Sequence, residues 1–496
     1  MVRTPSDDSG RFDYILRTVP SVRPALLGLL ALAVACSPAG GRRPGTVVLA
    51  SGADLQSMNS LVTTHPLAKQ VQRYALLTTL VRYDSALAIE PYLARYWSWS
   101  DDRRELILTI HGGVRWHDGR PTTAADVAWT LTTALDPAAG YPRLADLADL
   151  ERATAMDEHT VSLRFRRPMN GIPDVLTDLA ILPRHLLGEI QPSELRSAAW
   201  NAKPVGNGPF RFVRHEPNRR WAFRANEAFP PSLGGRPRID RLVVAVVDEP
   251  MTKLAALVSG ELDFAGIQPA HASFVADERG LAVLEYPLLF TYGLVFNTRR
   301  PPFDRLDVRR AIDLAIDRTA LVHGYLFGFG RAASGPLPPE LDSLAPEPFY
   351  APGRGRVLLG EQPLDFELLT VGSGEAPLEQ MLQSQLALIG IRVRIRQLEL
   401  ASFLDRVYGA ARDFDAAVLG ISGDPALGYL RSLLDLAGVE APAGLTGRAL
   451  LATFTDSMPV AFLYHARGVQ GMNRRVGGVR MDLRGELPTV TRWTIE

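Results

Sequence analysis

The amino-acid sequence predicts an α/β protein, and two observations indicate this class. Short apolar runs typical of strands alternate with amphipathic helical patterns along the chain after residue 45. Hydrophobic residues make up 46% and charged residues 22% of the 496 residues, which is typical of a folded chain and excludes disordered and fibrous proteins. At roughly 100 to 200 residues per domain, this length predicts several domains.

The first expected strand covers residues 46–50, which read TVVLA. β-branched and apolar residues also predict strands over residues 106–110 and 242–247. Residues 391–398, IRVRIRQL, alternate apolar and polar side chains with period two, as a half-buried strand does.

Apolar residues at three- and four-residue spacing predict helices over residues 70–83, 123–135, 307–327 and 377–389. The second of these has clear ends. Thr123 can cap its start, Asp126 lies in its first turn where the helix dipole favours negative charge, and Asp136-Pro137 ends it.

The charges balance, with 54 Lys and Arg against 54 Asp and Glu. Because no net positive field attracts a polyanion, we expect no nucleic-acid partner.

The N-terminus carries the features of an export signal. An apolar run of 11 residues, 25–35, follows Arg17 and Arg23 and is too short to span a bilayer. It ends in small residues before Cys36, the single cysteine, in a pattern that resembles the lipobox of bacterial lipoproteins. We therefore predict a signal peptide over residues 1–36, lipidation of Cys36 and a linker over residues 37–45; a plain secretory signal with an incidental cysteine is the alternative.

No catalytic, cofactor or metal site is predicted. His111 and His117 are six residues apart, which does not place them on one helical face, and no second cysteine exists to bind zinc. The nucleophile motif Gly-x-Ser-x-Gly and a phosphate-binding Gly-Lys-Ser/Thr loop are both missing from the sequence. We expect a protein that is not an enzyme.

A series of segments carries a more specific signal. In order between residues 80 and 465, the chain reads LVRYD, PYLA, GVRWHDG, TTAADV, ILPRHLL, PVGNGPF, FNT, VRRAI, GPLPP, LIGIRV, FDAAVL and PVAFLYH. This series resembles family 5 of the bacterial extracellular solute-binding proteins, typified by dipeptide- and oligopeptide-binding proteins of transport systems.

The resemblance implies a two-lobed periplasmic-binding-protein fold of type II with an extra inserted subdomain. By that resemblance, the first lobe is discontinuous and comprises residues 46–79, 204–289 and 466–496. The inserted subdomain covers residues 80–203, and the second lobe covers residues 290–465 and is shortened between residues 425 and 458.

The resemblance also implies ligand-binding residues. Ile421, Ser422, Gly423 and Asp424 match the turn in which an aspartate pairs with the ligand's α-ammonium while backbone groups bind the peptide as an added strand. The alternative is that Asp424 merely starts a turn before a proline, and Ile421 stands where the family usually has Trp. On the opposite lobe, the segment that begins with His65 and Pro66 is expected to bind the other edge of the ligand.

The implied function is the substrate-binding component of an ABC transporter, which captures a short peptide or similar small solute between its lobes. Its expected partners are that solute, a membrane permease with its ATPase, and the membrane itself through the lipid anchor. We expect a monomer, without a cofactor, in the periplasm or cell envelope. The alternatives are a non-peptide ligand, such as an oligosaccharide, nickel complex or opine, or a degenerate envelope protein that no longer binds a transported ligand.

Overall fold

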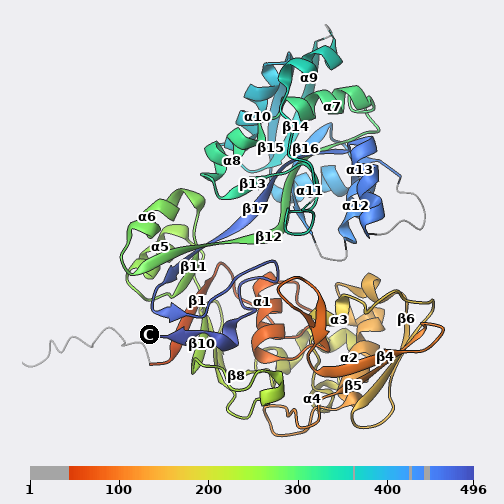
Figure 1. Ribbon diagram of the computed structural model, residues 1–496, viewed down its shortest axis with the longest axis vertical. Coiled ribbons are helices and arrows are strands. Elements are labelled where there is room, and N and C mark those ends of the chain that lie inside the picture. The colour runs from red at the N-terminus through yellow and green to blue at the C-terminus, as the bar shows by residue number, and fades with distance from the viewer. Residues whose placement is uncertain (1–43, 344, 361–362, 424–426, 441–446) are drawn as a thin grey trace, which may run out of the picture. The chain divides into compact units, whose positions relative to one another are not determined.

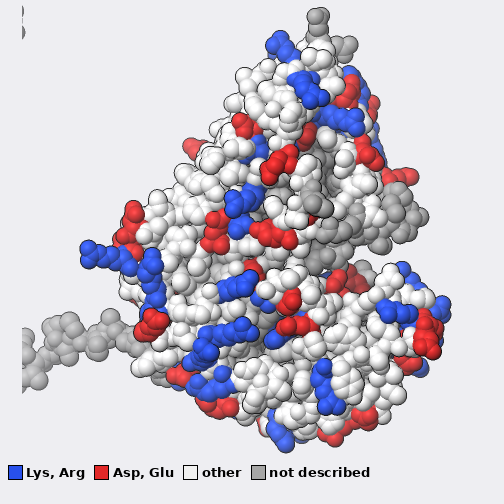
Figure 2. Space-filling view, in the orientation of Figure 1, with Lys and Arg blue, Asp and Glu red and all other residues white. Residues whose placement is uncertain are grey.

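The computed structural model describes residues 44–496 except residues 344, 361–362, 424–426 and 441–446, and these residues form one compact unit. Positive and negative side chains are mixed over the face shown in Figure 2, in keeping with the balanced composition. Of the helices in the described ranges, none has the length and apolar character to cross a membrane.

An 11-stranded mixed sheet runs through the described residues (Figure 1). Its strand order is β15-β14-β16-β12-β17-β11-β1-β10-β9-β8, with β13 paired to β17. The strands are β1 Thr46–Ser51, β8 Phe210–Glu216, β9 Arg220–Ala225, β10 Arg241–Val246, β11 Phe264–Gly266, β12 Leu281–Phe296, β13 Gly330–Ala332, β14 Leu364–Val371, β15 Ile391–Leu398, β16 Ala416–Ser422 and β17 Val460–Asn473.

Two long antiparallel strands, β12 and β17, lie in the middle of this sheet and connect its two parts (Figure 1). Their pairing is regular from Leu281 to Pro287 and resumes at Thr291, opposite His465, after a register shift. A shift of this kind bends a strand pair locally and increases its twist. A second shift follows between Tyr292 and Gly293. The sheet is therefore continuous but irregular over one short stretch of its two longest strands, which we call the irregular point.

Separate hydrophobic cores lie on the two sides of this irregular point. The first core uses buried side chains between Val47 and Tyr286 and between Val476 and Trp493. Two further cores use side chains between Leu294 and Tyr464 only. Since chain segments from two distant parts of the sequence build the first core, its strands are brought together by folding rather than by sequence proximity.

The cores between Leu294 and Tyr464 cover opposite faces of β12, β14 and β16. Leu294 and Leu368 belong to one of them, whereas Val295 and Leu369 belong to the other. Side chains alternate between the faces of a strand, so each face carries its own core. The helices in this part are α7 Leu306–Ala315, α8 Arg318–Leu326, α9 Pro352–Leu359, α10 Pro377–Ala387, α11 Leu400–Tyr408, α12 Tyr429–Ala437 and α13 Leu451–Ser457.

A smaller sheet, of order β4-β5-β7-β6, packs with the first core. The remaining elements of this part are β2 Val81–Tyr83, β3 Ile89–Pro91, β4 Ala94–Trp99, β5 Glu105–Ile110, β6 Leu150–Ala155, β7 Thr160–Phe165, α1 Pro66–Val71, α2 Ala124–Leu135, α3 Val175–Asp178, α4 Arg184–Leu187, α5 Pro250–Val258, α6 Ala272–Asp277, β18 Val476–Gly477 and β19 Thr494–Ile495. Helix α2 begins with a capping box of Thr123 and Asp126, which satisfies backbone N–H groups that the first turn leaves free.

Most of the expected elements are confirmed. The strands predicted over residues 46–50, 106–110, 242–247 and 391–398 correspond to β1, β5, β10 and β15. The helices predicted over residues 123–135 and 377–389 correspond to α2 and α10.

Two predicted helices are wrong in their extent. The helix expected over residues 70–83 begins earlier, at Pro66, continues as a π-helix over Gln72–Leu76 and then stops, because Thr78 donates its N–H to the Asn207 side chain at 3.0 Å. The helix expected over residues 307–327 is two helices, α7 and α8. Asp317 starts the second by accepting the N–H of Ala320 at 2.9 Å.

Candidate functional site

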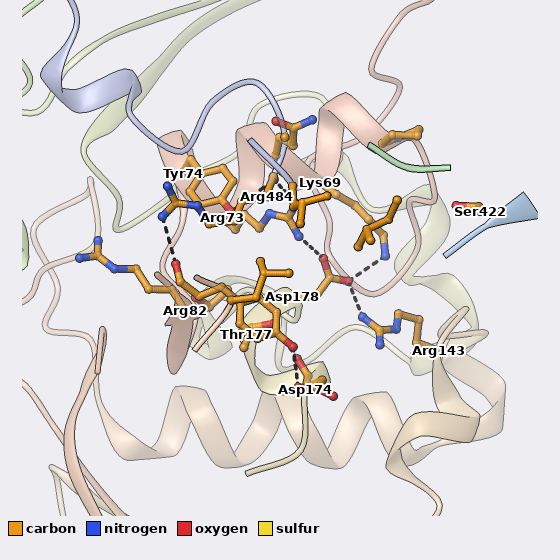
Figure 3. A pocket seen from close by; sticks show the side chains of 18 of the residues that line it. Lys69, Arg73, Tyr74, Arg82, Arg143, Asp174, Thr177, Asp178, Ser422 and Arg484 are labelled. Carbon is orange, nitrogen blue, oxygen red and sulfur yellow. Dashed lines mark hydrogen bonds and ion pairs between the residues drawn. The ribbon is translucent and has the colours of Figure 1, made fainter. Parts of the chain in front are cut away.

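A cavity of about 560 Å³ lies where α1 and its surroundings approach the middle of β12 and the end of β16. On one side, the described residues that line it come from three chain segments of the first core, and among them are Thr64, Pro66, Lys69, Gln70, Arg73, Tyr74, Tyr83, Arg143, Asp174, Asp178 and Arg484. On the other side, Leu289, Ser422 and Gly423 line it. Figure 3 shows Ser422 at the end of a strand, facing the group of charged side chains.

The charged wall of the cavity is organised around one carboxylate. Asp178 is bound by Lys69 Nζ at 2.9 Å, by Arg73 Nη1 at 2.8 Å and by Arg143 Nη1 at 3.2 Å (Figure 3). Burial alone would raise the pKa of Asp178, but the three cations hold that pKa well below its usual range. Asp178 is therefore ionised. Its single negative charge does not neutralise all three cations, so positive charge remains on this wall.

Helix α1 positions Lys69, and the π-helix Gln72–Leu76 that continues it positions Arg73. His65 caps α1, with Nδ1 accepting the N–H of Ala68 at 3.3 Å, and Pro66 occupies its first turn, where a missing N–H costs nothing. Lys69 and Arg73 are four residues apart and so project from the same helical face.

The C-terminal segment is held against the same helix. Gln70 Oε1 accepts the N–H of Glu486 at 2.6 Å and the N–H of Leu487 at 3.0 Å. Two residues before Glu486, Arg484 contributes to the cavity wall and donates from Nη1 to the carbonyl of Tyr83 at 3.2 Å. These contacts join residues far apart in the sequence into one wall.

A second carboxylate in the wall is bound by a phenol. The hydroxyl of Tyr83 donates to Asp174 at 2.5 Å. Burial and the neighbouring Asp174 carboxylate raise the pKa of Tyr83 above its usual range, so that the phenol stays protonated.

On the other side of the cavity, the end of β16 has an unpaired edge. Within the described ranges, β14 pairs with β16 only at Leu368↔Ala416 and Leu369↔Ala417, although β16 continues to Ser422. The N–H of Gly423 donates to the carbonyl of Leu289 at 2.7 Å, toward β12. Since backbone groups of successive residues point to opposite sides of a strand, those of Ser422 point away from β12, toward the unpaired edge.

The structure brings together three of the predicted site residues. Pro66, Ser422 and Gly423 line the cavity. His65 lies next to its rim as the cap of α1, and burial lowers the pKa of its imidazole while Asp54 acts in the opposite sense.

The other predicted site residues lie elsewhere. Ile421 is 9% exposed and packs in a core with its side chain away from the cavity. Asp424 and Cys36 lie outside the described residues. No group of three or more His, Cys, Asp and Glu side chains suited to a metal ion gathers within the part of the chain that the structure describes.

Sequence reasoning missed the charged wall. Arg73 lies in the helix predicted over residues 70–83 and Lys69 directly precedes it, so their four-residue spacing is a signal that was available. Arg143, Asp178 and Arg484 carry no comparable signal, because only the fold brings them to α1.

Separate cores bridged by a continuous strand pair, with a cavity lined from both sides, define a two-lobed α/β binding protein of the periplasmic-binding-protein fold. The family model described as "Bacterial extracellular solute-binding proteins, family 5 Middle" matches residues 88–436. The chain belongs to this family, and the predicted family and fold class are confirmed.

Known proteins agree with this assignment. Di/tripeptide-binding protein 2 of Pseudomonas aeruginosa is 30% identical over 451 residues, which are 83% of this chain and 83% of that protein. The fold is similar to the ABC transporter substrate-binding protein CtaP of Listeria monocytogenes, with a TM-score of 0.77, 17% identity and coverage of 91% of this chain and 99% of that chain. It is also similar to NikZ of Campylobacter jejuni in complex with Ni(L-His), with a TM-score of 0.74, 20% identity and coverage of 91% and 100%.

Proposed function

We propose that the protein captures a short peptide in the cavity beside β16 and delivers it to the permease of an ABC transporter. The observation that carries this proposal is the unpaired edge of β16, which ends at a cavity with a cationic wall. The peptide-binding relative and the transporter-associated structural neighbour support the same function. In this proposal the protein is a receptor and not an enzyme.

Peptide backbone fits the unpaired edge. An extended peptide that adds to a strand gains main-chain hydrogen bonds whatever its side chains are. The outward backbone groups of Gly420 and Ser422 provide the donors and acceptors for such an added strand. Affinity from the backbone suits a receptor that accepts many sequences.

The two ends of a peptide fit opposite charges at the site. Lys69, Arg73 and Arg143 share Asp178, and Arg143 also pairs with Asp146. Three cations thus face two carboxylates, and the remaining positive charge favours the peptide carboxylate. For the α-ammonium we propose Asp424, which follows the cavity residue Gly423 in the sequence.

We propose that binding closes the lobes around the irregular point in β12 and β17. The register shifts between Pro287 and Thr291 and between Tyr292 and Gly293 mark a stretch where the two strands can bend while the pairing on either side is kept. The moving bodies are then residues 46–79, 204–289 and 466–496 with the inserted residues 80–203 on one side, and residues 290–465 on the other.

We also propose that Cys36 becomes the lipidated N-terminus and anchors a monomeric receptor in the cell envelope. The apolar run before Cys36 supports this proposal. Mass spectrometry of the N-terminal fragment from the native host should show a diacylated Cys36 and no residues before it. A fragment that starts elsewhere, or an unmodified Cys36, would contradict it.

The ligand proposal is tested by native mass spectrometry of the purified protein, followed by calorimetric titration with di- and tripeptides. Peptides should co-purify or bind, and C-terminal amidation should weaken them because it removes the charge that the cationic wall binds. A nickel–histidine complex and an oligosaccharide serve as comparison ligands. If either binds while no peptide does, the peptide assignment is wrong.

A further inference from the structure

A second cavity, of about 390 Å³, lies at the end of β14. The described residues around it come from β12, β14, β15 and β16 and from helices α8, α10 and α11. It is lined by Thr370 and Glu379, by the aromatic side chains Tyr292, Tyr325 and Tyr408, and by Gly420.

The polar group of this cavity is a buried carboxylate. Glu379 is 7% exposed, and one of its oxygens accepts the hydroxyl of Thr370 at 2.7 Å. Within the described ranges, no Lys, Arg or His lies within ion-pair distance of it. Glu379 lies in the first turn of α10, where the helix dipole stabilises negative charge. A buried carboxylate in this position favours a cation that comes from outside.

Aromatic rings surround that carboxylate. Tyr292 and Tyr325 are half-buried, and burial, with the charge of Glu379 added, raises the pKa of each phenol, so both remain neutral. Faces of neutral aromatic rings attract ammonium and guanidinium groups. At the rim, Leu404 and Tyr408 are 44% and 55% exposed and offer apolar surface to an aliphatic chain.

This cavity adjoins the proposed peptide site along one strand. Gly420 lines it, whereas Ser422, two residues further along β16, lines the first cavity. Residues two apart share a face of a strand and are about 7 Å apart. A Cβ atom at Gly420 would lie 2.6 Å from the ring of Phe290, so glycine at this position leaves room for the two aromatic rings that flank it.

We propose that the second cavity is a subsite for a cationic side chain, lysine or arginine, of the bound peptide. This inference rests on the proposed function. The peptide backbone lies on the edge of β16, the side-chain stem lies on the apolar rim, and the charged end meets Glu379 between the tyrosine rings.

The test is calorimetric titration of the purified protein with tripeptides that carry one lysine at each position in turn, each matched by a norleucine peptide. Norleucine keeps the aliphatic stem and removes the charge. At one position, lysine should bind about tenfold more tightly than norleucine. Glu379→Gln should abolish that preference, so that lysine and norleucine peptides bind it with similar affinity.

Two further variants separate the alternatives. Glu347→Gln neutralises an exposed carboxylate outside the cavity and should keep the lysine preference. Tyr325→Leu should reduce the preference while Glu379 is intact, which provides a result even if Glu379→Gln does not fold. If lysine and norleucine peptides bind the protein with equal affinity at every position, the proposed subsite does not exist and the proposed function stands. If no tripeptide binds, the proposed function itself fails.

Discussion

Thr291 on β12 and His465 on β17 are directly opposite each other, and the threonine hydroxyl lies 2.9 Å from His465 Nδ1. The pair stands between two register shifts, one after Pro287 and one after Tyr292. His465 is buried, and burial lowers its pKa to about 4. The two strands that join the cores therefore carry a neutral imidazole at their irregular point.

We predict that this imidazole makes stability depend on pH. The unfolded chain takes up a proton at His465 below about pH 6.5, whereas the folded protein does so only near pH 4. The free energy of unfolding should therefore fall as the pH is lowered from 6.5 to 4. Denaturant titrations across this range should show that His465→Gln removes up to about 3 kcal/mol of the fall.

His117 contributes to the same pH dependence, because burial lowers its pKa to about 4 as well. In His465→Gln, the free energy of unfolding should therefore still fall to some extent as the pH is lowered. The exposed His323 provides the matched control, and His323→Gln should keep the full slope. An unchanged slope in His465→Gln would contradict the prediction.

We predict that Asp178→Asn lowers the free energy of unfolding by about 3 kcal/mol, because Lys69, Arg73 and Arg143 lose the carboxylate that they share. Chemical denaturation measures this change. The exposed pair of Asp149 and Arg167 is the control, since Asp149→Asn should cost less than about 1 kcal/mol. Equal losses in the two variants would show that the shared carboxylate has no special role.

The motif PVGNGPF has a packing role that a substitution can test. A Cβ atom at Gly206 would overlap the carbonyl oxygen of Leu76, which is backbone and cannot rotate away. Gly206→Ala should therefore lower the free energy of unfolding by about 1 to 3 kcal/mol in thermal or chemical denaturation. At Gly171 a Cβ atom meets no heavy atom within 4 Å, so Gly171→Ala should leave stability nearly unchanged.

The unpaired edge of β16 predicts that backbone, rather than the side chain, of Ser422 binds peptide. Ser422→Pro removes the outward N–H and should weaken tripeptide binding at least about tenfold, whereas Ser422→Ala should bind as the parent protein does. Calorimetry measures both variants, and circular dichroism verifies that the proline variant is folded. Equal affinities for the proline variant and the parent would exclude strand addition at this position.

Much of the fold could be predicted because the signals are local. The alternation over residues 391–398 and the cap formed by Thr123 and Asp126 both appear in the structure as expected. Where contacts distant in sequence compete, prediction fails: the hydrogen bond between Thr78 and Asn207 ends a helix that periodicity alone extends. The cap at Asp317 was a local signal, and it divides a stretch that was expected to be one helix.

The candidate site was predictable on one side only. Ser422 and Gly423 were found through the family resemblance, and they line the cavity. The grouping of Arg143, Asp178 and Arg484 depends on tertiary structure, since these residues come from separate parts of the chain. In the sequence, Glu379 is one of several polar residues in a predicted helix. Only the structure shows that it is buried and bound by Thr370.

The place of β17 in the sheet has a consequence for biosynthesis. This strand, Val460–Asn473, lies between β12 and β11, both of which precede it in the sequence. The part of the sheet formed by β1, β10 and β11 therefore cannot join β12 until β17 has been synthesised. Until then the nascent chain holds two separate parts of the sheet, and the continuous sheet forms only when β17 enters between them.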